Sequence, residues 1–328
     1  MYDVIAVGTA AIDLFADTES ELLTTQTNGA KQKHICYPSG TKILMKRLDF
    51  FTGGGGTNTA VSFARLGLKT AFLGNMGLDD DADFILKELK KEKVDFIGTR
   101  SKDKTNYSIV LDSIEHDRTI LIYRGASDHL SFDRIAKSKL KAKWFYFTSL
   151  MGQSYQTSLD LLKFAKKNRI KTAANISSYL AAKGAKELKP MLERLDVLIF
   201  NKEEAQQMLR TKTGDIYELL RRSKSCGPGI VVITNGKEGA YCCDGAYYYF
   251  LPASKIRVIE STGAGDAFAS GFIAGMIKWK GVEFSMKIGL ANAQSVIRHV
   301  GSKHNLLKWN SALRDAKIYK MKVIKKPQ

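Results

Sequence analysis

The sequence of 328 residues contains little that would cross-link, export or anchor a protein. Its four cysteines, Cys36, Cys226, Cys242 and Cys243, form no C-x-x-C pair, so we expect free thiols in a reducing compartment and no zinc site. The sequence has no run of eighteen apolar residues, and its start, MYDVIAVGTAAIDLF, lacks the basic region and long apolar core of a signal peptide. We therefore expect a cytoplasmic protein without membrane contact.

Several enzyme signatures are missing as well. The sequence has no G-x-x-x-x-G-K-[ST] segment, which excludes a P-loop nucleotide site. It has no H-R-D and D-F-G pair, which excludes a protein kinase. It also lacks G-x-S-x-G and H-E-x-x-H, which excludes the common serine hydrolases and zinc proteases. Any chemistry must come from another arrangement of residues.

Positive charge is the main excess in the composition. The sequence has 51 lysines and arginines against 33 acidic residues, a formal net charge of +18. Such an excess is compatible with nucleic-acid binding and with a lysine-rich solvated surface. The basic residues are dispersed over predicted helix faces and the C-terminal tail, which favours the solvated surface. We expect no nucleic-acid partner, and a non-catalytic ligand or nucleic-acid binder is the remote alternative.

Short β-branched runs alternate with helical patterns through most of the sequence. The predicted strands are Tyr2–Val7, Lys69–Leu73, Trp144–Phe147, Ile170–Ala174, Val197–Phe200 and Ile230–Ile233. The predicted helices are Asn58–Leu66, Asp79–Glu92, Gln156–Asn168, Lys202–Leu209, Ile216–Arg222, Gly265–Lys280 and Glu283–His299. This alternation predicts one α/β domain over residues 1–328, with a mainly parallel sheet.

Two regions depart from this alternation. Residues 33–51 and 105–124 are extended in pattern, and the second resembles a hairpin around a charged turn at residues 115–118. Strands outside a helix-covered sheet suggest a separate cover for a binding site. We therefore predict a small β-sheet lid formed from about residues 14–51 and 105–124.

The segment S-T-G-A-G-D-A-F, at residues 261–268, is the strongest chemical signal. A predicted strand, Lys255–Ile259, precedes it, and a helix rich in small residues follows. The amides of Gly263, Ala264 and Gly265 at this helix start form a candidate anion site, suited to a phosphoryl group. Asp266 beside it is a candidate general base for an attacking hydroxyl.

Local chemistry alone leaves a second interpretation of this segment open. Thr262 would be the N-cap of the helix, and Asp266 would only complement the helix dipole. Gly271 and Gly275 would weaken the helix unless a neighbouring segment packs closely against it. They therefore suggest that this helix is buried near the site.

Two further segments have candidate binding residues. The run of four glycines at residues 53–56 precedes an amphipathic helix, and Asn58 offers both a donor and an acceptor to a polyol. Asn201 and Glu204 follow a buried strand and open a helix, which is where α/β folds place ligands. A helix cap explains this second pair equally well.

Taken in order, these segments resemble the signatures of the ribokinase-like family, also called the PfkB carbohydrate kinase family. GGGGTN and STGAGDAF are similar to its two main signatures. The other matching segments are GTAAID at 8–13, GNMGLDDDADFI at 74–85, GAS at 125–127, NKEE at 201–204 and TNGKEGA at 234–240. The resemblance covers nearly the whole sequence. It implies a three-layer αβα sandwich with a mainly parallel central sheet and a small β-sheet lid.

The resemblance also implies roles for particular residues. It implies an ATP-dependent kinase that phosphorylates a hydroxyl of a sugar, with Asp266 as base and residues 263–265 as the anion hole. The acceptor would be held by Asp13, Gly54, Gly55 and Asn58. The nucleotide and Mg²⁺ would be held by Asn201, Glu204, Thr234, Gly236, Gly239 and Asn292, with Glu204 acting on the metal indirectly.

Some positions depart from the family pattern. Glu260 stands where the family usually has Asp, at a position tied to monovalent cations, which leaves potassium activation open. Gly55 stands where many ribokinases have Lys, which does not favour ribose. Residues 174–177 and 297–302 resemble adenosine kinases, so a nucleoside kinase is the alternative. Lids of this family often pair, which makes a homodimer through the lid a further expectation.

Overall fold

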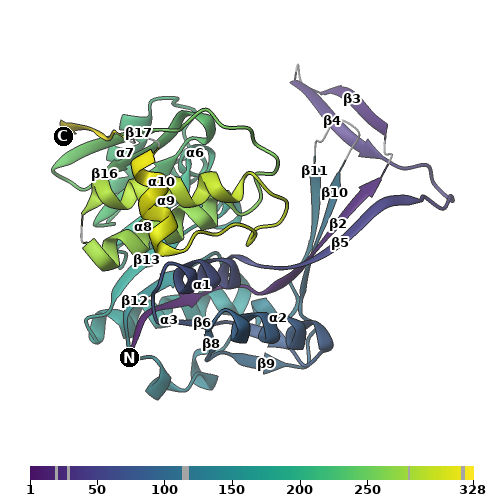
Figure 1. The fold of residues 1–328 in the computed structure, drawn as a ribbon, viewed down its shortest axis with the longest axis horizontal. Helices are drawn as coiled ribbons and strands as arrows, with labels where there is room; N and C mark the ends of the chain where they lie inside the picture. Colours follow the sequence, from purple (N-terminus) through teal and green to yellow (C-terminus); the bar gives the residue numbers. More distant parts are fainter. Residues whose placement is uncertain (19–20, 28–29, 113–117, 280, 319–321) are drawn as a thin grey trace.

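A mainly parallel sheet forms the centre of the protein, here described as a computed structural model over residues 1–18, 21–27, 30–112, 118–279, 281–318 and 322–328 (Figure 1). Seven strands, from β8 to β15, are parallel, and the last three are antiparallel. In spatial order the strands are β18 (Ile324–Pro327), β17 (Tyr247–Pro252), β16 (Gly239–Cys243), β15 (Ile230–Thr234), β14 (Val197–Asn201), β13 (Lys171–Asn175), β12 (Ala142–Phe147), β1 (Tyr2–Val7), β6 (Thr70–Leu73) and β8 (Asp95–Phe96).

The parallel strands bury side chains on both faces, because successive residues of a strand point to opposite sides. In β1, Val4 and Ala6 join one hydrophobic cluster, and Ile5 and Val7 join the other. This explains why the strands appear in the sequence as continuous apolar runs and not as alternating ones.

Helices cover both faces of the sheet and complete the three layers. One face packs against α1 (Gly55–Arg65), α2 (Asp80–Lys91), α8 (Ala264–Trp279), α9 (Val282–Val296) and α10 (Trp309–Ile318). The other packs against α3 (Gly152–Lys167), α4 (Ser178–Ala181), α5 (Gly184–Leu192), α6 (Lys202–Leu209) and α7 (Ile216–Lys224). Short 3-10 turns are η1 (Gly125–Asp128), η2 (Phe132–Arg134), η3 (Lys137–Lys139) and η4 (Gly236–Glu238).

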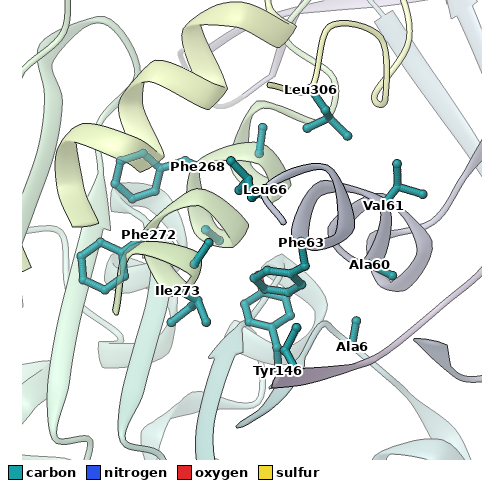
Figure 2. Close-up of a cluster of buried hydrophobic side chains, with 14 of the residues drawn as sticks. Ala6, Ala60, Val61, Phe63, Leu66, Tyr146, Phe268, Phe272, Ile273 and Leu306 are labelled. Atoms are coloured by element: carbon teal, nitrogen blue, oxygen red, sulfur yellow. The ribbon is translucent and has the colours of Figure 1, made fainter. Parts of the chain in front are cut away.

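The first of these cores holds α1 and α8 against the sheet (Figure 2). Phe63 of α1 meets Tyr146 of β12 edge to face, with ring centroids 5.3 Å apart. Phe268, Phe272 and Ile273 of α8 are buried in the same cluster. Because α8 has so large an apolar surface in this core, its N-terminal end is held firmly above the sheet.

A second sheet projects from the helix-covered body (Figure 1). Its strands, in spatial order, are β11 (Arg118–Tyr123), β10 (Asn106–Asp112), β2 (Ala11–Thr18) and β5 (Met45–Gly53). The hairpin of β3 (Glu21–Thr27) and β4 (Ala30–Cys36) lies at its far end, and β7 (Asn75–Gly77) pairs with β9 (Thr99–Ser101) near the body.

The predicted α/β fold with a mainly parallel sheet is confirmed, and the hairpin expected within residues 105–124 is present as β10 and β11. The turn predicted at residues 115–118 lies outside the described residues except for Arg118. The strand predicted over Lys255–Ile259 is wrong, because this segment pairs with no strand and exposes Val258 and Ile259. Within the part of the chain that the structure describes, no helix has the length and apolarity to cross a membrane.

Candidate active site

Asp266 lies in the first turn of α8, where two other segments hold its carboxylate. Asn58 of α1 donates a hydrogen bond from Nδ2 to Asp266 Oδ2 at 2.9 Å. Ser302, in the loop after α9, donates from Oγ to Asn58 Oδ1 at 3.0 Å. Because the Asn58 amide has a partner at each end, its orientation is fixed, and that of Asp266 with it.

A second polar contact lies one helical turn further along the same pair of helices. Ser270 of α8 donates to Ser62 of α1 with 2.7 Å between the two hydroxyl oxygens. Residues 58 and 62 of α1, and 266 and 270 of α8, are each four apart and so share one helix face. Two matched contacts therefore fix the rotation of α8 about its axis, which determines where Asp266 points.

Asn292 belongs to this buried contact and not to the expected nucleotide site. Its Nδ2 donates to Ser62 Oγ at 3.0 Å and to the carbonyl of Ala267 at 2.8 Å, and its Oδ1 accepts from the amide of Leu307 at 2.9 Å. The side chain is fully buried, so we correct its predicted role from nucleotide contact to packing of α9 on α8.

Close packing of α8 on α9 accounts for the two glycines within α8. A Cβ on Gly271 would lie 2.8 Å from Gly289 Cα, and one on Gly275 would lie 2.7 Å from Ser285 Cα. Larger side chains would push the helices apart. The expectation that this helix is buried and closely packed is confirmed.

The segment before Asp266 forms the tight start of α8. Gly263 has φ of +80°, and a Cβ there would lie 2.6 Å from Ser302 Cβ, so only glycine fits without strain. The Ala264 amide donates to the carbonyl of Ser261 at 3.2 Å, whereas a Cβ on Gly265 would meet nothing within 4 Å. Of the three predicted anion-hole residues, Ala264 and Gly265 line a cavity, and Gly265 has open space where a side chain would stand.

The N-cap role that the alternative interpretation gave to Thr262 is wrong. Helix α8 begins at Ala264, so Gly263 precedes it, and the hydroxyl of Thr262 donates to Glu260 Oε1 at 2.6 Å. Its amide donates to the same oxygen at 3.1 Å. Glu260 itself is buried, with 2% of its surface exposed.

The protein environment makes Asp266 an unusually basic carboxylate. Burial raises its pKa to about 6, and the negative charge of Asp13 adds to this, while the hydrogen bond from Asn58 and the charge of Lys303 oppose it. A base with a pKa near the working pH is well matched to proton transfer. At neutral pH the carboxylate is mostly ionised and able to accept a proton.

Two of the predicted acceptor residues, Asn58 and Asp13, lie near this carboxylate. Asp13 of β2 is 7% exposed and Asn58 is 6% exposed. Burial raises the pKa of Asp13, while a hydrogen bond from Ser108 of β10 and the charge of Lys303 oppose the rise. Gly54, with φ of +90°, and Gly55 begin α1 beside the loop after β1. Two strands of the projecting sheet and two helices thus supply the polar groups around the carboxylate of Asp266.

An apolar cavity of about 560 Å³ opens on the other side of Gly265. Its walls include Phe268 of α8, and Leu290, Gln294 and Ile297 from one face of α9. Gln294 is 3% exposed, and neither polar atom of its amide has a partner among the described residues. Thr234, Gly236 and Gly239 also line this cavity.

A polar cavity of about 500 Å³ adjoins the apolar one and shares Thr234, Gly236 and Gly265 with it. Asn201 and Glu204 line this second cavity. They also form a capping box for α6, in which each side chain accepts from the other's backbone amide, at 2.8 and 2.9 Å. The cap interpretation therefore holds, and both residues still face a cavity that leads to Gly265.

These features match a known family. A family model described as pfkB family carbohydrate kinase matches residues 1–309. The chain belongs to this family. It is therefore a carbohydrate kinase, a phosphotransferase whose acceptor is an alcohol group. A 5-dehydro-2-deoxygluconokinase from Clostridium perfringens is 29% identical over 323 residues, which cover 90% of this chain and 87% of that protein.

Solved structures of this family share the fold. The ribokinase of Arabidopsis thaliana, solved with ribose and ATP, superposes with a TM-score of 0.82 at 20% identity, covering 96% of this chain and 99% of the ribokinase. The adenosine kinase of Sinorhizobium meliloti gives a TM-score of 0.80 at 21% identity, with 96% and 99% covered. The chain thus has the ribokinase fold.

Members of the pfkB family are expected to use Mg²⁺, and the polar cavity fits a metal held mostly by water and phosphate. Among the described residues, no three His, Cys, Asp or Glu side chains come together to hold an ion. Mg²⁺ commonly keeps several waters and takes one or two carboxylates plus substrate phosphates. Glu204, which lines this cavity, would supply such a carboxylate. Burial raises its pKa, and the nearby Glu203 and Asp266 charges add to this.

Sequence reasoning missed several residues of this pfkB site. Ser302 ends the segment 297–302, which stands out in the sequence only for its resemblance to adenosine kinases, and Lys303 follows it outside any recognised motif. Ser108 lies in a strand of the projecting sheet. Gln294 could have been found, because residues 290, 294 and 297 are spaced three or four apart and so form one face of a predicted helix.

Proposed function

We propose that the protein transfers the γ-phosphoryl group of ATP to a hydroxyl of a sugar or sugar-like molecule, with Asp266 as general base. The observation that supports this best is the position of Asp266. Its carboxylate is fixed by Asn58, has a pKa of about 6, and is adjacent in sequence to Gly265, which lines both neighbouring cavities. The hydroxyl donor and the phosphate would meet at this place.

The acceptor would bind between the two sheets. Asp13 accepts hydrogen bonds from sugar hydroxyls, Asn58 donates and accepts them, and the backbone around Gly54 and Gly55 lies close to the ring. One hydroxyl is directed at Asp266, which takes its proton as the oxygen attacks the γ-phosphorus. The proton moves to the carboxylate, and the bond between the γ-phosphorus and the bridging oxygen breaks to release ADP.

The donor nucleotide would occupy the two joined cavities. Its base would lie in the apolar cavity between Phe268 and α9, with the amide of Gln294 hydrogen-bonded to its edge. The phosphates would pass Thr234, Gly236 and Gly239 toward the helix start at Gly265, where backbone amides and the helix dipole stabilise negative charge. When bound, Mg²⁺ would neutralise phosphate charge, with Glu204 and Asn201 holding its waters.

An Asp266→Asn variant tests the role of this residue. Asparagine still accepts the hydrogen bond from Asn58 but accepts no proton. We expect turnover to fall by about 10³-fold or more, with ADP binding retained. Asp160→Asn, at an exposed ion pair 3.0 Å from Lys163, is the matched control. Near-normal turnover in Asp266→Asn would refute the assignment of the base.

The acceptor itself is to be identified by a panel of neutral sugars, sugar acids and nucleosides, read out by ADP release. Sugars are favoured because a relative at 29% identity is a 5-dehydro-2-deoxygluconokinase. A nucleoside kinase is the second candidate, since residues 174–177 resemble adenosine kinases and an adenosine kinase shares the fold. Turnover of nucleosides alone would establish the second candidate. The panel is run with and without potassium, because Glu260 stands at a position that the family ties to monovalent cations.

We further propose that two copies associate through the projecting sheet, which would serve as a lid over the acceptor. Its face opposite Asp13 exposes Leu48 (42%), Phe50 (56%) and Leu121 (51%). Apolar side chains gathered on one exposed face often mark a protein interface.

A small-molecule kinase with free thiols also fits a cytoplasmic location.

A further inference from the structure

Lys303 is a buried cation close to the proposed acceptor site. Its side chain is 6% exposed. The ammonium group donates to Thr52 Oγ1 of β5 at 2.7 Å and to Glu88 Oε2 of α2 at 2.7 Å. Its backbone carbonyl accepts from Arg65 of α1 at 2.9 Å. Three other segments, β5, α1 and α2, therefore fix this lysine.

Lys303 lies close to the carboxylate of Asp266, because it directly follows Ser302, whose hydroxyl binds Asn58, the hydrogen-bond partner of Asp266. A charge at this place acts on both site carboxylates. It lowers the pKa of Asp13 and of Asp266, against the effect of their burial. Two carboxylates that share a site with little water repel each other, and such repulsion favours the protonated form of one of them. A cation that is itself shielded from solvent acts over a longer range than an exposed one, because less water screens it.

We propose that Lys303 is a positioning residue for the phosphoryl transfer: it keeps Asp266 ionised, and so able to accept the hydroxyl proton, at neutral pH. The inference rests on the proposed function of Asp266 as base. In this role Lys303 does not contact the substrate. The role follows from the burial of the ammonium group and its fixed place at the base of the projecting sheet.

A purely structural role is the competing explanation, since the ion pair with Glu88 also ties the loop to α2. The two explanations differ in whether the charge at residue 303 changes the pH dependence of turnover. The titratable and charged groups that face Lys303 or line the same cavity are Glu88, Lys91 and Glu92 of α2, Arg65 of α1, Asp13 of β2, Asp266 of α8, and His304 of its own loop.

The test compares variants in the dependence of kcat/KM for the acceptor on pH. Lys303→Met removes the charge, Lys303→Arg retains it, and Thr52→Val removes a hydrogen bond to the lysine but leaves the charge of Lys303 and of Glu88 in place. Lys91→Met is the control, because Lys91 lines the same cavity from an exposed position. All variants use saturating ATP and a neutral acceptor, so the titration of the nucleotide is common to all.

We expect the acidic limb of the Lys303→Met profile to move to higher pH by about half to one unit. Lys303→Arg, Lys91→Met and Thr52→Val keep the limb of the unchanged enzyme. His304→Gln, which leaves the limb in place, shows that His304 is not the group observed.

An unmoved limb in Lys303→Met, or an equal upward shift in Thr52→Val, would overturn the proposal. If Lys303→Met does not fold, the double variant with Glu88→Gln carries the test, since it leaves no unpaired buried carboxylate, and a shift in the same direction is expected. A failure of the functional proposal itself gives a different result. In that case the unchanged enzyme phosphorylates nothing in the panel, or Asp266→Asn retains its turnover.

Discussion

Replacing Asp266 by asparagine should stabilise the folded protein, and the gain should depend on pH. Folding raises the pKa of this carboxyl from 3.8 to about 6. The folded protein therefore binds the proton more tightly than the unfolded chain, and stability is lost as pH rises through this range. Asparagine does not titrate and still accepts the hydrogen bond from Asn58, so it lacks this loss.

The shift of about two pKa units sets the size of the effect, at about 1.4 kcal/mol per unit. We expect the variant to be more stable by about 1.5 kcal/mol at pH 5 and by about 3 kcal/mol at pH 8. These values are upper bounds, because the side chain is only half-buried. Urea unfolding of both proteins at several pH values between 5 and 8 measures the difference.

A gain in stability that does not vary with pH would show that packing, and not ionisation, separates the two side chains. A variant less stable than the parent at pH 8 would contradict the reasoning outright. Asp160→Asn again serves as the control, because its ion pair with Lys163 is exposed and such pairs contribute little.

Three further predictions concern the surroundings of Asp266. Gly263→Ala should lower the unfolding free energy by about 1–2 kcal/mol, because φ is +80° and Ser302 lies in the way, whereas Gly265→Ala should not, as thermal melting would show. Gln294→Leu should raise the KM for ATP by about five- to tenfold, because a hydrogen bond worth about 1 kcal/mol to the nucleotide base is lost. The exposed Gln207→Leu is the control, and an unchanged KM in Gln294→Leu would show that Gln294 does not bind the nucleotide base. Phe50→Asp should turn a dimer into monomers in sedimentation experiments, and Phe84→Asp, exposed on α2, should not; equal behaviour of the two would exclude the sheet as the interface.

The sequence indicated most of the fold because the parallel strands are buried on both faces and so appear as apolar runs. The sequence predicts a wrong strand where the residue types favour a strand but no partner strand is available among the described residues. Ile256, Val258 and Ile259 have high strand propensity, yet no neighbouring strand accepts their hydrogen bonds, and Val258 lines the apolar cavity instead. The last strands, β16 to β18, are antiparallel and follow no helical pattern, so the alternation gave no sign of them.

Candidate site residues can be proposed from the sequence where one short segment contains the whole arrangement. Asp266 and the glycines before it are such a case, because the helix start, the proposed anion site and the proposed base lie within four residues. Asn292 was placed wrongly because a helix advances about 100° per residue, so Gln294, two residues on, lies on a different face. Lys303 could not be inferred, since Thr52, Glu88 and Arg65 meet it only in the folded chain.

The proposed acceptor site would have to keep its carboxylates ionised although they are partly or fully shielded from water. The negative charge of Asp13 and burial both raise the pKa of Asp266. The opposing groups come from separate segments, with Asn58 on α1 and Lys303 after α9. A change that loosens either segment should therefore shift the pH dependence of turnover even where the fold survives. Because those same segments hold the base of the projecting sheet, closure of that sheet over an acceptor and activation of Asp266 would depend on one shared set of contacts.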